Sequence, residues 1–357
     1  MKLFLLLLSV VRTGAFTARR ASPSSAARRV RAAPEAVRLW ERHSSSSSRF
    51  ALGAARKDFL ALDFDGVVCA SSGESSVSSI IAANKEWPDF CNIPRDAAKF
   101  ALISSIVSAV RPVIETGYEN MLVVRYLVED YRGAAGVGGR GLDVQIWRDA
   151  NTQYILEDWN AHFRDALLAR YGSTKEGLIA SFGQTRDTMI EEEFPFWVSL
   201  NKIYPAVLGS LRTISSDTCV GTKVNPFLDS VFVITTKQER FVRAILENNG
   251  FNIFDLDNAY GSKVRVLQEL TRRLAASAEQ CAQEEQPTLH FVEDRYETLL
   301  ATLAHKAAHP LSLNVKCYLV DWGYNTPEQR RAARENPEVE LISQEEFGAL
   351  VGRVTGR

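Results

Sequence analysis

The fold of this chain is decided by the stretch FLALDFDGVV, residues 59–68. Residues 59–62 are apolar and lead into two aspartates, Asp63 and Asp65, which are followed by Gly66. A short apolar run before a glycine turn is typical of a buried parallel strand. Alternate residues of a strand point to the same side. We therefore expect Asp63 and Asp65 to face the same way at the carboxyl end of the first strand.

Three further apolar runs have the length of strands, and a stretch of helical character follows each of them. The predicted strands cover residues 230–235, 289–292 and 315–320, and the predicted helices cover 238–248, 295–306 and 327–335. Strands that alternate with helices form mostly parallel sheets with helices on both faces. The sequence therefore predicts the α/β class, with a doubly wound, Rossmann-like core.

A long insertion of helical character separates the first strand from the second. Its patterns predict helices over residues 98–110, 115–131, 157–171 and 175–182. We expect a core made of residues 58–72 and 204–350, a mainly helical cap over 73–203, and a tail over 351–357.

The glycine-rich stretch GAAGVGGRG, residues 133–141, interrupts the predicted cap. It follows a helix rather than a strand, and it lacks the Lys-Ser/Thr ending of a phosphate-binding P-loop. We therefore interpret it as a flexible loop.

Composition and charge exclude several classes of protein. Of the 357 residues, 46% are hydrophobic, but the longest apolar run, residues 3–11, is too short for a membrane-spanning helix of about 20 residues. Residues 58–357 hold 30 Lys and Arg against 41 Asp and Glu, so a basic nucleic-acid-binding body is not expected. The five cysteines are far apart and form no C-x-x-C pair, which argues against a disulfide framework and for a reducing compartment.

Residues 1–57 have the composition of a targeting segment. They hold 12 Lys and Arg but only two acids, Glu35 and Glu41. The apolar run and the small residues Thr13-Gly14-Ala15 are typical of a secretory signal, and the Arg-, Ala- and Ser-rich stretch behind them is typical of a transit peptide. This order resembles the bipartite presequence of algae with secondary plastids, which predicts delivery to the plastid stroma. Secretion and a basic arm for nucleic acid remain the alternatives.

Polar groups are predicted to meet at the carboxyl ends of the parallel strands, where open α/β sheets bind their ligands. In chain order these groups are Asp63 with Asp65, then Thr235, then Lys263, then Glu293 with Asp294. The intervals from 235 to 263 and from 263 to 294 each leave room for about one strand–helix unit.

These four motifs, in this order, resemble those of the haloacid dehalogenase (HAD) superfamily. They are DFDGVV at 63–68, VITTK at 233–237, the lysine of GSK at 261–263, and FVED at 291–294. The segments LDFDGVVC, RPVIETGYEN, TTKQERF, LHFVEDR and DWGYNT also look like a plant and algal family of plastid HAD-like proteins, close to phosphoglycolate phosphatases. The insertion after the first motif is similar to the helical cap of many HAD members.

The resemblance implies a Mg²⁺-dependent phosphatase of a small phosphorylated metabolite. It implies that Asp63 is the nucleophile and that Asp65 is the general acid and base. Thr235 and Lys263 would bind the transferring phosphoryl group. The metal would be held by Asp63, Asp65 through its carbonyl, Asp294 and a further acid, because Mg²⁺ prefers oxygen ligands.

Three assignments stay open at this point. Thr298 stands where many HAD phosphatases place a second metal-binding acid, so either Glu293 or Glu297 is expected to replace it. Thr236 competes with Thr235 for the phosphate. The cap residues that we expect to contact the substrate are Arg111, Glu115, Tyr118 and Arg125, with a salt-bridged helix face as the alternative.

Two other functions fit the same motifs less well. A non-catalytic HAD-like protein that binds a metabolite or a protein in the plastid has no need of Asp63, Asp65 and Asp294 together. The other hypothesis is a dehalogenase or phosphonatase. A dehalogenase does not normally need a second aspartate after the nucleophile, so Asp65 favours phosphate ester chemistry over dehalogenation.

Overall fold

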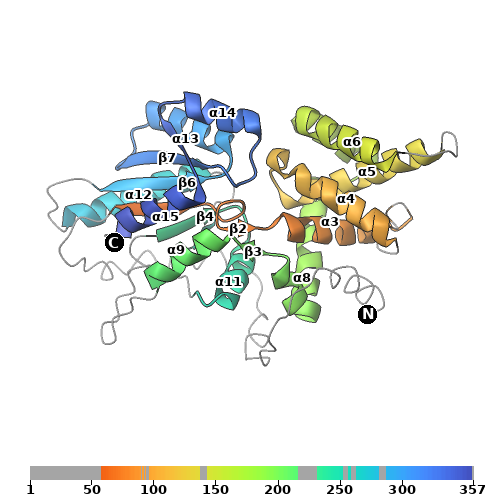
Figure 1. Ribbon diagram of the computed structural model, residues 1–357, viewed down its shortest axis with the longest axis horizontal. Helices are drawn as coiled ribbons and strands as arrows, with labels where there is room; N and C mark the ends of the chain where they lie inside the picture. Colours follow the sequence, from red (N-terminus) through yellow and green to blue (C-terminus); the bar gives the residue numbers. More distant parts are fainter. Residues whose placement is uncertain are drawn as a thin grey trace. The chain divides into compact units, whose positions relative to one another are not determined.

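The central element of the molecule is a six-stranded parallel sheet (Figure 1). The structure is a computed structural model that describes residues 58–355 except for residues 90, 92, 94–95, 137–142, 216–230, 252–255, 259–262 and 281–286. The strands are β1 (Phe59–Leu62), β4 (Val231–Thr235), β5 (Leu256–Asn258), β6 (Thr288–Glu293), β7 (Asn314–Val320) and β8 (Val339–Ile342). Their spatial order is β5-β4-β1-β6-β7-β8, so β1 lies inside the sheet between β4 and β6.

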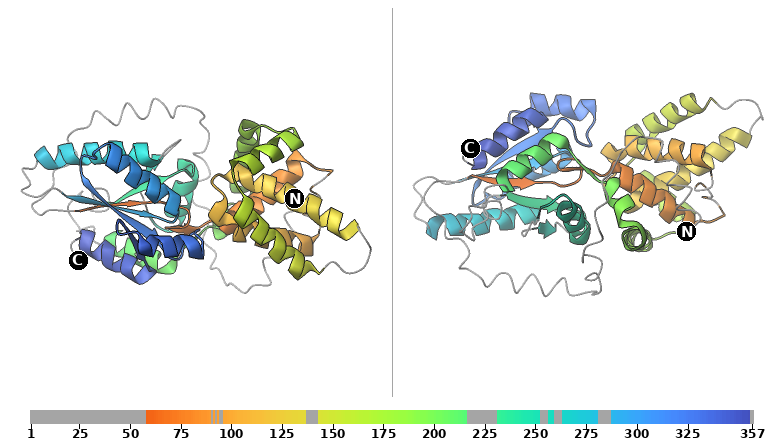
Figure 2. Two further views of the ribbon diagram at one scale, coloured as in Figure 1. Left: turned by 90° about the horizontal axis from the view of Figure 1, so that it is seen from above. Right: turned by 60° about the horizontal axis from the view of Figure 1, so that its bottom comes forward.

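Helices cover both faces of this sheet (Figure 2). They are α9 (Pro205–Ser215), α11 (Glu239–Asn248), α12 (Lys263–Gln280), α13 (Tyr296–Ala308), α14 (Pro327–Glu335) and α15 (Gln344–Thr355). Alternate strand residues, such as Phe59, Ala61 and Phe291, pack with the apolar sides of α12 and α13 in one buried cluster. Helices α9 and α15 pack against each other, and α15 contacts β1. This confirms the predicted doubly wound α/β core.

A helical region is inserted between β1 and β4. It is flanked by two short strands, β2 (Cys69–Ala70) and β3 (Lys202–Ile203), which pair antiparallel at its base. Its helices are α3 (Ser72–Glu86), α4 (Ala97–Ala109), the 3₁₀ turn η2 (Arg111–Val113), α5 (Gly117–Gly136), α6 (Val144–Asp158), α7 (Ala161–Tyr171) and α8 (Lys175–Ser199). We call α3–α8 with η2 the helical cap.

Local sequence signals explain where the cap helices begin and end. The side chains of Asp96, Asp143, Asn160 and Thr174 each accept a backbone N–H in the first turn of the helix that follows. Gly172 ends α7 with a φ of 62°, a left-handed conformation that glycine adopts without strain.

Two predicted cap segments differ from the structure. The predicted helix over 157–171 is divided, because α6 continues to Asp158 and the N-cap residue Asn160 starts α7. The predicted helix over 175–182 continues to Ser199, although it bends at Glu193, two residues before Pro195.

The expected glycine-rich loop over 133–141 is also corrected in part. Residues 133–136 continue α5, and residues 137–141 lie outside the described part of the chain. A substituent at Gly133 would meet no atom within 4 Å, so nothing in its surroundings requires a break of the helix there.

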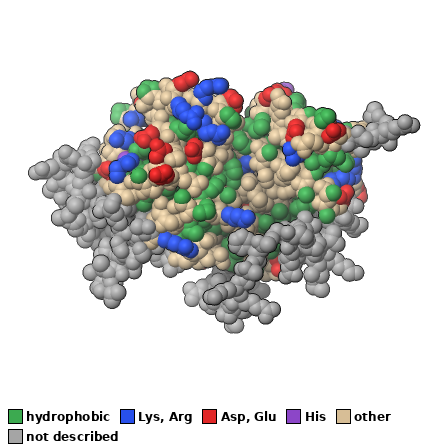
Figure 3. Space-filling view, viewed as in Figure 1, with side chains coloured by type: hydrophobic (Ala, Val, Ile, Leu, Met, Phe, Trp, Pro, Cys, Tyr) green, Lys and Arg blue, Asp and Glu red, His purple; other side chains and the backbone are tan. Residues whose placement is uncertain are grey.

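Two further features of the described residues are the charge of their surface and the polarity of their helices. On the face drawn in Figure 3, acidic and basic side chains are intermixed over the coloured residues. Among the described residues, no helix is both long enough and apolar enough to cross a membrane.

Candidate active site

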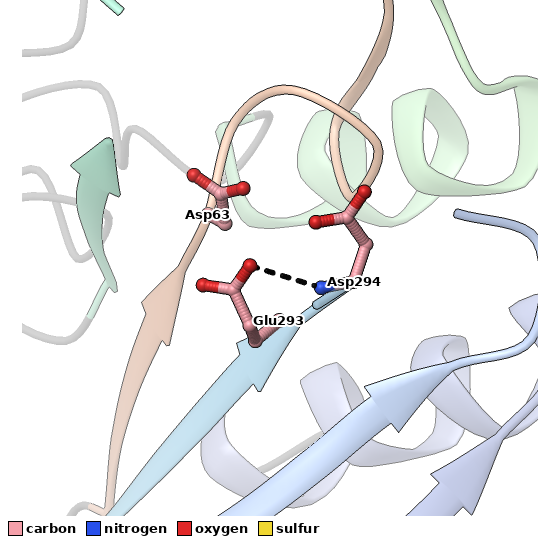
Figure 4. A group of neighbouring side chains, drawn as sticks. All are labelled: Asp63, Glu293 and Asp294. Carbon is pink, nitrogen blue, oxygen red and sulfur yellow. Dashed lines mark hydrogen bonds between the residues drawn. The ribbon is translucent and has the colours of Figure 1, made fainter. Parts of the chain in front are cut away.

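Three carboxylates converge at the carboxyl ends of β1 and β6. Asp63 follows β1, while Glu293 ends β6 and Asp294 follows it (Figure 4). Oxygen atoms of these three side chains lie within 4.8 Å of one another, and all three residues are buried. The backbone N–H of Asp63 donates to the carbonyl of Val292 at 2.9 Å, which ties the two strand ends together.

The loop after Asp63 turns sharply at Gly66. Gly66 has a φ of 89°, and a Cβ there would collide with the carboxylate of Asp294 and with the ring of Tyr324. The turn is closed by the N–H groups of Val68 and Cys69, which both donate to the carbonyl of Phe64. Glycine at this position therefore lets the loop approach Asp294 closely.

Lys263 supplies the positive charge nearest to the cluster. Its Nζ lies 2.9 Å from Asp63 Oδ1 and 2.7 Å from Glu293 Oε2. The side chain is only 9% exposed; burial alone would lower its pKa, but Asp63 and Glu293 raise it above the usual range. Lys263 is the first residue of α12, so the helix start brings it to the sheet edge.

One ammonium does not balance three buried carboxylates. Burial, and then the charge of Glu293, raise the pKa of Asp63 to about 7, although Lys263 opposes the shift. Burial and the charges of Glu293 and Asp63 likewise raise the pKa of Asp294 well above its usual value. The excess of negative charge, carried by oxygen ligands only, fits a divalent cation such as Mg²⁺.

Asp65 lies in a different electrostatic environment. Burial alone would raise its pKa, but the cations of Lys237 and Arg111 outweigh burial and hold the pKa below the usual value. Lys237 Nζ lies 3.3 Å from Asp65 Oδ1, and only 1% of the Lys237 side chain is exposed. The surroundings therefore raise the pKa of Asp63 and lower the pKa of Asp65, the two acids of the DFD motif.

A buried network joins Asp65 to the cap. Lys237 Nζ also lies 3.8 Å from a carboxylate oxygen of Glu74 on α3, and the Glu74 side chain is fully buried. Arg186 on α8 donates to both Glu74 oxygens, at 2.8 and 2.6 Å. Ser78 and Trp197 also donate to Glu74 Oε1. Two cations and two donors thus satisfy one buried carboxylate.

Thr235 is the last residue of β4 and is 2% exposed. Its hydroxyl accepts the backbone N–H of Lys237 at 3.1 Å, which orders the turn that carries Lys237. Thr236 is exposed.

The segment after β7 completes the site. The N–H of Tyr324 donates to Asp294 Oδ2 at 2.8 Å, and the Asn325 amide donates to the Asp294 carbonyl at 2.9 Å. A Cβ at Gly323 would collide with Asp294, so this turn lies directly against it. The segment DWGYNT contributes to the family resemblance, but the sequence gives it no role. The sequence therefore does not predict Tyr324 and Asn325 as the groups that orient Asp294.

The two acids that the sequence offers as the remaining metal ligand, Glu293 and Glu297, lie in different places in the structure. Glu293 belongs to the carboxylate cluster. Glu297 lies in the first turn of α13, where its side chain accepts a hydrogen bond from the Gln329 side chain of α14 at 2.6 Å. Glu297 therefore joins two helices, and Glu293 is the acid at the site.

The four cap residues predicted to contact substrate divide into two pairs. Arg111 lies near Asp65, and its guanidinium stacks over the Tyr324 ring at 5.0 Å. Glu115 lies 3.5 Å from Arg295, the residue after Asp294.

The other pair lies inside the cap. Tyr118 is 2% exposed, and Lys175 lies over its ring at 5.9 Å. Arg125 stacks on Trp87 and Tyr171 and pairs with Glu129 at 3.7 Å. The structure gives this pair cap contacts, whereas it brings Arg111 and Glu115 to the core side.

Comparison with known proteins gives structural similarity only. No family model matches the chain. No curated protein matches it either. Among solved structures, one described as a predicted phosphatase from Clostridium acetobutylicum is 13% identical, with a TM-score of 0.44, over 83% of this chain and 99% of that chain. A predicted phosphoglycolate phosphatase from Haemophilus somnus 129PT is 13% identical, with a TM-score of 0.42, over 84% and 99%.

A third structure is a HAD family hydrolase from Deinococcus radiodurans R1 with bound phosphate and sodium. It is 11% identical, with a TM-score of 0.35, over 84% of this chain and 97% of that chain. Similarities at this level carry no inference about activity.

Proposed function

We propose that this protein is a Mg²⁺-dependent phosphomonoester hydrolase that acts on a small phosphorylated metabolite through an aspartyl-phosphate. The observation that carries the proposal is the cluster of Asp63, Glu293 and Asp294 within 4.8 Å at the carboxyl edge of a parallel sheet, with Lys263 against two of them. This edge is where open α/β sheets bind ligands.

Asp63 is the group that forms the covalent bond in this proposal. One of its carboxylate oxygens attacks the phosphorus, and the bond from phosphorus to the ester oxygen breaks. A bound Mg²⁺ would neutralise charge between the carboxylates and the phosphate dianion. Asp63, Glu293 and Asp294, with the Asp65 carbonyl that the resemblance adds, would hold it.

Lys263 and Thr235 are proposed to hold the transferring phosphoryl group. The Lys263 ammonium already lies 2.9 Å from Asp63, so a phosphoryl group at Asp63 comes within its reach. Thr235 ends the neighbouring strand, which places its hydroxyl at the same edge. Fixed donors of this kind stabilise developing charge without reorganisation.

Asp65 is proposed to move the proton. It protonates the departing alkoxide in the first step. In the second step it takes a proton from a water molecule that attacks the phosphorus of the aspartyl-phosphate, the bond from phosphorus to the Asp63 oxygen breaks, and inorganic phosphate leaves. Lys237 and Arg111 favour the ionised form that the second step needs. A phosphate dianion that enters beside Asp65 raises the pKa of Asp65, which favours the proton uptake that the first step needs.

The proposal is tested with a panel of phosphomonoesters, the full chain and the Asp63→Asn variant, each with Mg²⁺ and with excess EDTA. We expect hydrolysis of at least one small ester, loss of turnover by more than about 10³-fold in the variant, and loss with EDTA. Asp63→Asn is nearly isosteric, so its circular dichroism should match that of the native chain. Native turnover in a folded Asp63→Asn protein would contradict the assignment of the nucleophile.

We also propose that the enzyme works in the plastid stroma. The support is the signal-like start and the acid-poor stretch in residues 1–57, which lie outside the described residues. The cysteines that the structure describes, Cys69, Cys91 and Cys317, are free, which suits a reducing compartment.

A further inference from the structure

The start of helix α3 takes a hydrogen-bond partner from the core. Within the described residues, Ser71, the N-cap residue of α3, makes no side-chain hydrogen bond to the first turn of the helix. The N–H of Ser72, the first residue of α3, donates to the hydroxyl of Tyr324 at 2.8 Å, across 252 positions of the sequence. The first N–H groups of a helix have no partner inside the helix, so this contact satisfies one of them. Helices α4, α6, α7 and α8 differ, because side chains directly before them accept these N–H groups.

The backbone of Tyr324 lies against the proposed metal site. Its N–H donates to Asp294 Oδ2 at 2.8 Å. Its ring is so close to the loop after β1 that a Cβ at Gly66 would be 2.9 Å from the ring carbon Cδ2. The same residue therefore contacts a proposed metal ligand through its backbone and the first helix of the cap through its side chain.

Trp322, two residues before Tyr324, contacts both connections between the core and the cap. Its Nε1 donates to the carbonyl of Val67, in the loop that leads to β2, at 3.2 Å. Its own carbonyl accepts the hydroxyl of Tyr204, the residue after β3, at 3.5 Å. The strands β2 and β3 are the antiparallel pair at the base of the cap. The segment after β7 therefore holds the chain where it leaves the core and where it returns.

The first turn of α3 is also connected to the other side of the site. Glu74, two residues after Ser72, pairs with Lys237 at 3.8 Å, and Lys237 pairs with Asp65 at 3.3 Å. Two core residues thus hold this turn, Tyr324 on the side of Asp294 and Lys237 on the side of Asp65. Chains of packed and hydrogen-bonded groups such as these can carry energetic coupling between two places in a protein.

We propose that Tyr324 is a positioning residue that couples the proposed Mg²⁺ site to the cap. When the start of α3 detaches from its hydroxyl, Tyr324 loses one of its anchors, Asp294 is less well oriented, and Mg²⁺ binds more weakly. Mg²⁺ binding therefore favours the attached state of α3 by the same factor. This inference rests on the proposed metal site, and its test measures the cap itself rather than turnover.

Hydrogen–deuterium exchange of the full chain, followed in peptides over residues 69–80, measures how often the start of α3 opens. Saturating Mg²⁺ should slow this exchange in the native chain by roughly fivefold or more, the lower end of the usual coupling between two sites. Titration calorimetry in the same buffer measures Mg²⁺ binding independently. This comparison uses native protein only, so it does not depend on the folding of a variant.

Tyr324→Phe removes the hydroxyl and keeps the ring and the backbone N–H that orients Asp294. Without Mg²⁺, exchange over residues 69–80 should be about 3- to 10-fold faster than in the native chain, because one hydrogen bond is lost. The slowing by Mg²⁺ should be absent from this variant. Its Kd for Mg²⁺ should stay within about threefold of the native value, because Asp294 keeps its partner.

A matched control is Tyr318→Phe, which removes a buried hydroxyl on β7. The hydroxyl of Tyr318 shares a hydrogen bond of 2.8 Å with His290 Nδ1 on β6, and Tyr318 is 3% exposed. This variant should keep the native exchange over residues 69–80 and the native slowing by Mg²⁺.

Two results would overturn the inference alone. One is a native chain that binds Mg²⁺ with no change of exchange over residues 69–80. The other is a folded Tyr324→Phe protein in which Mg²⁺ slows this exchange as much as in the native chain, since the hydroxyl would then serve only the stability of the cap. A native chain that binds no Mg²⁺ in the titration would contradict the proposed metal site, and this inference with it.

Discussion

Asp63 and Asp65 are two residues apart, yet the structure places them in opposite environments. Asp63 faces the acids Glu293 and Asp294 and has a raised pKa of about 7, while Asp65 faces Lys237 and has a lowered pKa. Acids whose pKa values are pushed apart are typical of sites where they have different tasks. In the presence of a divalent cation, Asp63 would be ionised and suited to attack.

Asp65→Asn should harm alkyl phosphates more than nitrophenyl phosphate. An alkyl ester leaves as a strongly basic alkoxide and needs the proton from Asp65, whereas nitrophenolate is a stable leaving group. Because Asp65 is also proposed to activate water in the second step, both substrates should slow, with a loss of about 10²–10⁴-fold for the alkyl ester. The measurement is the ratio of kcat on the two substrates in native and variant enzyme. An equal loss on both, without accumulation of the acyl-phosphate, would leave Asp65 as a turn residue only.

Asp294→Ala should weaken Mg²⁺ binding more than Glu293→Ala. Glu293 is already paired with Lys263 at 2.7 Å, so part of its charge is neutralised by the protein. Among the described residues Asp294 has no such pair, and it is oriented by the N–H of Tyr324. The Mg²⁺ concentration for half-maximal activity should rise more in Asp294→Ala, and Glu297→Ala should leave it unchanged. The reverse order of the first two variants would mean that Glu293 is the main metal ligand.

At the scale of elements, ion pairs of buried side chains connect the cap helices α3 and α8 to the candidate active site. Glu74 on α3 forms ion pairs with Arg186 of α8 and with Lys237 of the turn after β4. Lys237 also pairs with Asp65. These groups are almost fully buried, so each charge depends on the others for compensation. The position of the cap helices is therefore linked to the orientation of the proposed proton donor.

Glu74→Gln should destabilise the protein strongly. The change is nearly isosteric, but it leaves Arg186 and Lys237 buried with less compensating charge, a loss of about 3–5 kcal/mol in the free energy of unfolding. The control is Asp187→Asn, which removes the exposed pair between α8 and Arg240 of α11 and should cost less than about 1 kcal/mol. Urea unfolding of both variants measures the difference. Equal small losses would show that the buried network contributes little to stability.

The sequence predicts the polar residues at the strand ends better than it predicts the buried ion-pair network of Glu74, Lys237 and Arg186. Asp63, Thr235, Glu293 and Asp294 follow or end apolar runs, and such runs indicate their position at the sheet edge directly. Lys237 and Glu74 meet across 163 positions, and no local pattern on α3 marks Glu74 as a buried partner. The three-residue β5 is too short to stand out from its surroundings, and the four-residue β8 alternates only weakly. The sequence leaves open whether Arg125 contacts substrate or belongs to a salt-bridged helix face, because its stacking on Trp87 and Tyr171 depends on tertiary packing.

At the scale of the whole molecule, charge divides the chain into two parts. Residues 1–57 carry a net charge of +10 and the remaining residues carry −11. A basic, acid-poor leader is typical of a segment read by import machinery, whereas the acidic remainder contains the proposed enzyme. The two parts are therefore expected to have separate tasks, and the leader should be transferable to another protein.

Residues 1–57 should carry a fluorescent reporter into a secondary plastid, and residues 1–15 alone should carry it only into the secretory route. The physical reason is that residues 3–11 supply the apolar segment that a signal-recognition step needs, while the Arg- and Ser-rich stretch behind them supplies the second address. The control replaces Arg19, Arg20, Arg28 and Arg29 by glutamate within residues 1–57, which should stop delivery at the secretory route because the second address loses its positive charge. Fluorescence microscopy locates each reporter, and N-terminal sequencing of the mature protein shows which residues were removed. A mature protein that still begins near Phe16 would contradict the second cleavage, and a reporter secreted from the cell with residues 1–57 attached would support simple secretion instead.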